Sequence, residues 1–168
     1  MEFQDVINSR ASVREFTDQK IEKELLLKLI KNGMKAPSAI NKRPWVFYVY
    51  ESKESINLIR NVSPHGKYNA GAIILVAADK NKFILKARDY FLEDCAAATE
   101  NILLSAVDNG LGACWIGVYP MKDRVESLKE ALKLESNIVP FALIYLGYPK
   151  GEVKPKNIDE DNKIHFVD

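Results

Sequence analysis

Residues 72–80, AIILVAADK, restrict the possible folds of this chain more than any other stretch. Seven consecutive apolar residues without alternation are typical of a strand that is buried on both faces. Such a strand needs neighbours on either side and cover above and below, so it belongs in the middle of a sheet. The β-branched and aromatic run at residues 45–52, WVFYVYES, predicts a second strand of the same sheet.

A long helix is expected next. From residue 89 to residue 109, small and apolar side chains continue until Gly110, which is typical of a buried central helix that ends at a glycine. The other elements that the spacing of apolar residues delimits are helices near residues 3–7, 21–30 and 120–132, and strands at 113–119 and 139–149. In all, we expect four strands and five helices in one α+β domain that spans residues 1–168.

Composition excludes several classes of partner. The chain has 24 Lys and Arg against 23 Asp and Glu, a net charge of +1, which supplies no broad field for a nucleic acid or an anionic membrane. No apolar run reaches the roughly 18 residues of a membrane span, and the N-terminus does not resemble a signal peptide. We therefore expect a cytoplasmic protein, with no nucleic-acid or membrane partner, in which any positive site is local.

Cysteine and histidine offer little chemistry in this sequence. Cys95 and Cys114 lie far apart in apolar surroundings, which favours free buried thiols over a redox or metal role. His65 and His165 are isolated, so no metal site is expected.

The stretch SRASVREF, residues 9–16, places Arg10 and Arg14 four residues apart with Ser12 between them. With a helix on either side, the usual interpretation is a pair of surface charges near helix ends. The alternative is a receptor for a terminal phosphate, because two guanidinium groups and a hydroxyl can donate several charge-assisted hydrogen bonds. Taken alone, the pair favours the first interpretation.

Two other stretches are ambiguous when taken alone. Residues 36–45, APSAINKRPW, are either a simple connector rich in turn residues or a ligand-binding loop. Residues 110–115, GLGACW, lack the third glycine and the preceding strand of a Rossmann fingerprint, so their glycines are expected to end the long helix. Gly117, inside the following strand, suggests close approach of the backbone to a ligand.

Four segments together carry a more specific signal: SRASVREFTDQKIEKELL, KAPSAINKRPWVFYVY, DCAAATENILLSAVDNGLGACWIG and IYLGYPKGEVKPK. In this order and spacing they resemble the FMN-dependent nitroreductase family in its short form, and the resemblance runs through nearly the whole chain. It implies a central, mostly antiparallel sheet of four to five strands flanked by helices. It also implies a homodimer with two FMN molecules at the interface and a C-terminal tail that reaches the partner. The charged tail that ends in KIHFV, residues 163–167, fits that expectation, although a frayed end remains the alternative.

The resemblance also implies a role for individual residues. Arg10, Ser12 and Arg14 match the positions that hold the phosphate and ribityl end of FMN, and a basic tail residue, Lys156 or else Lys154, completes that site. Lys67 falls near the pyrimidine edge of the ring. The strand whose backbone reaches the isoalloxazine contains Trp115, Ile116 and Gly117. The segment that the partner lays against the flavin contains Lys35, Pro37, Ser38 and Asn41.

This sequence departs from the family pattern in three places. Arg43 replaces the usual glutamine before Pro-Trp, which adds a charge at the pocket mouth. Asn157 stands where the tail commonly carries an arginine, so that Lys156 or Lys154 must supply the charge. Gly71 and Ala72 replace Ala-Pro before a strand, a change that we interpret as structural.

The activity that the resemblance implies is that of an FMN-dependent NAD(P)H oxidoreductase. Hydride would pass in a ping-pong cycle through flavin N5 to a nitroaromatic, a quinone or a similar small acceptor. No catalytic side chain is expected, because the cofactor carries the reactive electrons. Only residues 79–91 are available as a lid, so we expect an open pocket and no room for the clamping segments of dehalogenating or flavin-cleaving relatives. A flavin storage, delivery or sensing module without turnover is the alternative.

Overall fold

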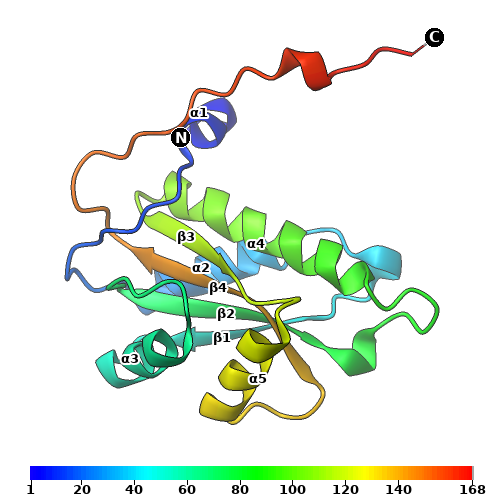
Figure 1. The fold of residues 1–168 in the computed structure, drawn as a ribbon. Helices are drawn as coiled ribbons and strands as arrows, with labels where there is room; N and C mark the ends of the chain where they lie inside the picture. The colour runs from blue at the N-terminus through cyan, green and yellow to red at the C-terminus, as the bar shows by residue number, and fades with distance from the viewer. Residues whose placement is uncertain (168) are drawn as a thin grey trace.

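A computed structural model describes residues 1–167 and contains one four-stranded sheet, in the order β1-β2-β4-β3. The strands are β1 (Trp45–Tyr50), β2 (Ala72–Asp79), β3 (Gly112–Gly117) and β4 (Ile138–Gly147). All three pairings are antiparallel, so the expected α+β fold with an antiparallel sheet is confirmed. Figure 1 shows β2 and β4 in the interior of the sheet and β3 at one edge.

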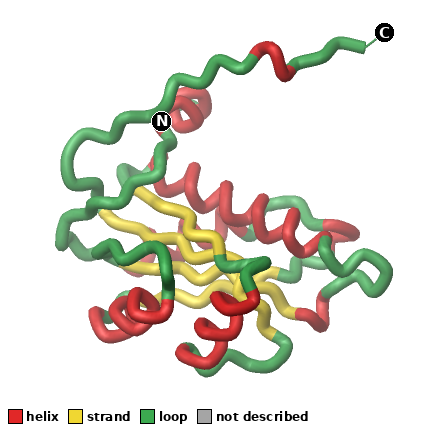
Figure 2. Tube along the Cα trace, viewed as in Figure 1, coloured by secondary structure: helices red, strands yellow, loops and turns green. Residues whose placement is uncertain are grey.

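The helices are α1 (Phe3–Ser9), α2 (Lys23–Gly33), α3 (Lys53–Val62), α4 (Tyr90–Asp108) and α5 (Lys122–Ala131). Short 3-10 turns are η1 (Ala39–Asn41), η2 (Lys80–Lys82) and η3 (Asp161–Lys163). The count of five helices agrees with the prediction, although the spacing of apolar residues located only the other four and not α3. The N-cap residue of α3, Ser52, accepts a hydrogen bond from the Ser55 amide, 3.1 Å away. Helices α2 and α4 cover one face of the sheet, while α3 and α5 cover the other (Figure 2).

The apolar run in β2 is buried on both faces, as the sequence predicts. Ile74 and Val76 pack in the cluster formed with α2 and α4, whereas Ile73 and Leu75 pack in the cluster formed with α3 and α5. Their neighbours on β4 alternate in the same way and are equally buried: Leu143, Ile144, Tyr145 and Leu146. The two interior strands therefore form the centre of both apolar layers.

A connector between α1 and α2 lies along the outer edge of β3. The Val13 amide donates to the Ala113 carbonyl at 2.9 Å, and the Thr17 amide donates to Tyr148 at 2.8 Å. Two glycines that face each other in register make this approach possible. A Cβ atom on Gly112 would lie 2.8 Å from the Val13 side chain, and one on Gly147 would lie 2.7 Å from Phe16.

This path differs from one expectation. Arg10 caps the C-terminus of α1 as predicted, but Arg14 lies within the extended connector, well before α2 begins at Lys23. The chain stays extended here because the edge of β3 offers backbone hydrogen-bond partners, which local apolar spacing does not reveal.

Beyond β4 the chain leaves the body and runs past α1 (Figure 1). Its apolar end is exposed, with Ile164, Phe166 and Val167 uncovered, Phe166 to 96%. Within residues 1–167 no helix combines the length and the hydrophobicity needed to cross a membrane.

Replacing Ile74 by alanine tests the assignment of the central strand. We expect the free energy of unfolding to fall by about 2–5 kcal/mol, because the fully buried side chain leaves a cavity between β2 and the helices. Urea unfolding of the purified protein measures the change. Val49→Ala is the matched control on the edge strand, where the side chain is 37% exposed, and should cost less than ~1 kcal/mol. Equal losses would contradict the assignment.

Candidate functional site

A cleft of about 820 Å³ lies between the end of α1, the connector and the C-terminal tail. It is lined by Arg10, Ser12, Arg14, Lys154 and Lys156. We call this the cationic cleft. The structure thus brings the predicted arginine pair and the serine together with both candidate tail lysines, and Asn157 lies beside them.

The extended connector explains why both arginines line the same cleft. In an extended chain, residues two apart point to the same side, so Arg10, Ser12 and Arg14 share one face. Val13 between them points the other way, against Gly112. The four-residue spacing therefore belongs to a strand-like segment with its polar face turned into the cleft.

The cationic side chains of the cleft form only long, weak contacts with other protein groups. Arg10 Nε lies 3.7 Å from a Glu100 carboxylate oxygen, and Arg14 Nη1 makes a 3.5 Å contact to the Ser12 carbonyl. Lys154 pairs with Glu152 at 3.8 Å where both side chains are exposed. Each guanidinium has five N–H donors, so most donors remain available for a ligand. Such a donor set fits a terminal phosphate group.

Cys114 lies on β3 behind the connector and is 1% exposed. Burial raises the pKa of its thiol, and the nearby Arg14 guanidinium acts in the opposite direction. Burial also raises the pKa of Cys95 to about 12. Both cysteines are free, as predicted, and neither is disposed to act as a nucleophile.

The loop that carries Lys67 packs against the other end of β3. A Cβ atom on Gly66 would lie 2.9 Å from Ile116 and 3.0 Å from the Tyr145 ring, so the backbone itself touches the strand. The positive φ of +78° at Gly66 allows this turn. Arg60 holds the loop by donating to the Lys67 carbonyl at 3.0 Å. Lys67 itself is exposed beside the strand that contains Trp115, Ile116 and Gly117.

Gly117 ends β3 in open space, since no atom lies within 4 Å of an added Cβ. Its carbonyl accepts a hydrogen bond from Arg124 Nη1 at 3.0 Å. Arg124 and Arg60 fix the backbone around this end of β3, yet sequence reasoning missed both. Each is one of several charged residues on an amphipathic helix, and nothing local distinguishes it.

The segment from Lys35 to Asn41 lies elsewhere in the same chain. The Ala39 amide donates to Asp94 on α4 at 2.7 Å, which anchors the segment on that helix. Burial raises the pKa of the Asp94 carboxyl above its usual value, and the hydrogen bond from the Ala39 amide offsets only part of that rise. The sequence-predicted residues of this segment, Lys35, Pro37, Ser38 and Asn41, do not line the cationic cleft of their own chain.

Arg43 is exposed on the same loop and bonds to two of its residues. Its Nε donates to Asn41 Oδ1 at 2.7 Å, and its amide donates to Ser38 Oγ at 3.0 Å. Positive φ angles at Ile40, Asn41 and Arg43 make the turn tight. Arg43, which stands in place of the family glutamine, thus forms its hydrogen bonds within the loop.

Comparison with known proteins agrees with this geometry. The sequence profile of the nitroreductase family matches residues 7–66 and 59–148. A relative in Methanothermobacter thermautotrophicus, provisionally named NADH dehydrogenase/NAD(P)H nitroreductase, is 35% identical over 99% of this chain and 87% of its own. The chain belongs to the nitroreductase family.

Solved structures of other nitroreductase-fold proteins match the architecture. A protein from Clostridium acetobutylicum, provisionally named NADH oxidase, is 40% identical, with a TM-score of 0.91 over 97% of this chain and 99% of its own. An FMN-dependent nitroreductase from Clostridium difficile is 33% identical, with a TM-score of 0.86 over 97% and 98% of the two chains. The predicted family and fold are therefore confirmed. Residues 1–167 of this chain contain no group of three or more side chains suited to hold a metal ion.

Gly112→Ala tests whether the glycine pair seats the connector. We expect the free energy of unfolding to fall by about 1–3 kcal/mol, because the new methyl group would overlap Val13. Gly117→Ala on the same strand is the control, since its Cβ meets nothing within 4 Å. Urea unfolding without added ligand compares the two. Equal stability of the two variants would contradict the packing.

Thiol reactivity tests the burial of the two cysteines. At about pH 8 we expect iodoacetamide to leave the native protein unmodified over hours, because burial raises both thiol pKa values. After unfolding in urea, both cysteines should react. Intact mass spectrometry counts the added groups, and rapid modification of native Cys114 would show that the connector opens.

Proposed function

We propose that this protein is an FMN-dependent NAD(P)H oxidoreductase. The observation that carries the proposal is the cationic cleft at one end of β3, with an open backbone at Gly117 at the other end. The two are joined by a single extended strand, which suits an elongated ligand with an anionic end. The Clostridium difficile relative is an FMN-dependent nitroreductase, and its 33% identity over nearly the full chain supports the same cofactor here.

The residues that would hold FMN divide by the chemistry of its parts. Arg10, Ser12 and Arg14 would bind the phosphate and ribityl end, with Lys156 or Lys154 from the tail. The backbone of residues 115–117 would face the isoalloxazine. Lys67 would place a positive charge at its pyrimidine edge.

Two further residues, Arg60 and Arg124, would act on the cofactor site indirectly, by holding its backbone. Arg60 would fix the loop that positions Lys67, and Arg124 would fix the carbonyl of Gly117. These two arginines would keep the backbone near the ring rigid, which preserves the orientation of its hydrogen-bonding groups.

Bound FMN would supply two-electron chemistry, taking hydride at N5 from NAD(P)H and giving it to a nitroaromatic, quinone or similar acceptor in ping-pong order. The protein would contribute binding, orientation and electrostatics, so no nucleophile or general base is needed. The exposed end of β3 leaves the approach open to small planar molecules.

We also propose that the active unit is a homodimer. The segment that includes Pro37, Ser38 and Asn41 lies apart from the cationic cleft of its own chain, so it would serve the cofactor of a second copy. The exposed apolar tail, with Phe166 96% exposed, would pack on that copy. Both ideas predict that dimer formation and cofactor binding are linked.

The double variant Arg10→Ala plus Arg14→Ala tests the phosphate site. We expect its affinity for FMN to fall by at least about a hundredfold, because hydrogen bonds to charged groups contribute ~1.5–3 kcal/mol each. Fluorescence titration of the flavin-free protein with FMN measures the dissociation constant. Lys53→Ala, an exposed residue at the start of α3, is the control and should bind normally. Full retention of FMN by the double variant would show that the phosphate lies elsewhere.

The activity itself is tested by anaerobic addition of NADH, then NADPH, to the flavin-loaded protein. Bleaching of the visible flavin absorbance, followed by reoxidation with a nitroaromatic or a quinone, is the expected result. Flavin that binds but is reduced by neither nucleotide would favour the storage or sensing alternative. A protein that takes up no FMN would overturn the proposal.

A further inference from the structure

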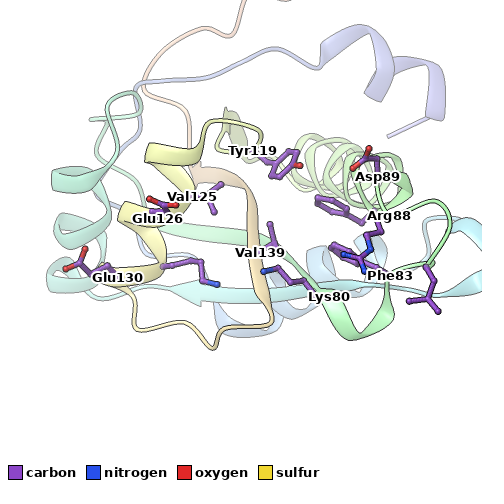
Figure 3. Close-up of a pocket in the computed structure, with 12 residues that line it drawn as sticks. Lys80, Phe83, Arg88, Asp89, Tyr119, Val125, Glu126, Glu130 and Val139 are labelled. Carbon is purple, nitrogen blue, oxygen red and sulfur yellow. The ribbon is translucent and has the colours of Figure 1, made fainter.

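A second cavity, of about 900 Å³, lies beyond the C-terminal end of β3, away from the cationic cleft (Figure 3). Its walls come from the loop between η2 and α4, from α5, from Tyr119 after β3 and from Val139 on β4. We call it the aromatic cavity. None of the residues predicted to bind the cofactor lines it.

One wall of this cavity is built from three aromatic rings. Phe83 and Phe91 are stacked, with ring centroids 4.4 Å apart and planes 9° apart. Tyr119 meets Phe91 edge-on at 5.2 Å. Phe91 is buried beneath the other two, which are half-exposed. A wall of this kind can accept a further planar ring against Phe83 or Tyr119.

A pair of lysines lines the same cavity. Lys129 Nζ donates to the Ser136 carbonyl at 3.0 Å, and Lys80 Nζ approaches the same oxygen at 3.5 Å. Two ammonium groups are therefore drawn together at one carbonyl. Neither lysine forms an ion pair with any carboxylate of residues 1–167. The two positive charges therefore repel each other without a direct carboxylate partner. Each ammonium group has two further N–H donors, and an anion placed between the two lysines could accept hydrogen bonds from both.

The remaining charges restrict the kind of anion. Asp89, Glu126 and Glu130 also line the cavity and are exposed, without an ion pair to any cation in the described residues. Arg88 adds one more cation. Three cations and three carboxylates thus line the cavity, and the two lysines at the Ser136 carbonyl are the cations that the structure holds together. A ligand with a single carboxylate could use this lysine pair while adding little negative charge near the three acidic side chains.

The aromatic cavity and the cationic cleft lie at opposite ends of β3. The connector pairs with Ala113 near the start of β3, whereas Tyr119 follows the end of the strand at Gly117. The five residue steps of β3 span about 17 Å at ~3.3 Å per residue. The aromatic cavity therefore lies far from the proposed phosphate end of the cofactor and shares no lining residue with the cationic cleft, while the proposed ring position beside residues 115–117 lies close to Tyr119.

We propose that the aromatic cavity binds a small aromatic monocarboxylate, with its ring on the Phe83 and Tyr119 wall and its carboxylate between Lys80 and Lys129. This ligand site shares no lining residue with the cationic cleft and does not depend on the cofactor that we propose there. Apolar enclosure and a few convergent polar groups are the features of small-molecule sites in general.

The test compares 2-naphthoate with its neutral isostere 2-naphthamide by isothermal titration calorimetry on the full chain, with and without saturating FMN. We expect naphthoate to bind at least about tenfold more tightly, because only it can accept charge-assisted hydrogen bonds from both lysines. The variant Lys80→Gln plus Lys129→Gln should remove that preference and leave naphthamide binding unchanged. Phe83→Ala should weaken both probes.

Two controls locate the site. Lys122→Gln, an exposed residue on α5 outside the cavity, should bind both probes like the unaltered protein. The double variant Arg10→Ala plus Arg14→Ala should also keep its affinity for naphthoate. The proposal fails if neither probe binds, if the two bind equally, or if the preference survives the loss of both lysines. Competition by FMN, or loss of naphthoate binding in the arginine variant, would instead place naphthoate in the proposed cofactor site and also overturn the proposal.

Discussion

The contact between the connector and the glycine pair on β3 and β4 is the constraint on which the site depends. Gly112 and Gly147 lie opposite each other, and neither has room for a side chain because Val13 and Phe16 occupy that space. This close approach lets backbone hydrogen bonds hold the connector on the sheet edge. The edge strand is thereby covered, and the polar face of the connector is turned outward into the cleft.

The central elements were predictable because their signals are long and unambiguous. The apolar run of β2 and the continuous small and apolar residues of α4 admit few interpretations, and both lie where the sequence predicts them. Trp45, the last residue of the ambiguous stretch 36–45, is a core residue that packs with α2 and α4, so burial accounts for it.

The site could be predicted only in part, and mainly through family resemblance. The arginine pair alone favoured surface charges, because the local pattern does not show that the chain between them is extended. That conformation results from pairing with Ala113, about a hundred residues away, which local reasoning cannot find. Arg60 and Arg124 were missed for a similar reason: their partners are backbone carbonyls on other elements.

Because the net charge is close to zero, local clusters of charge determine where an anion can bind. With 24 basic and 23 acidic residues, the molecule has no overall field to attract anions, so any anion site must arise from cations that the fold gathers in one place. The fold does this twice along β3. At one end, Arg10 and Arg14 face a cleft with only weak partners. At the other end, Lys80 and Lys129 share a single carbonyl in a cavity that Asp89, Glu126 and Glu130 also line. Because like charges held together raise the free energy of the unliganded state, both clusters are expected to be stabilised when an anion binds.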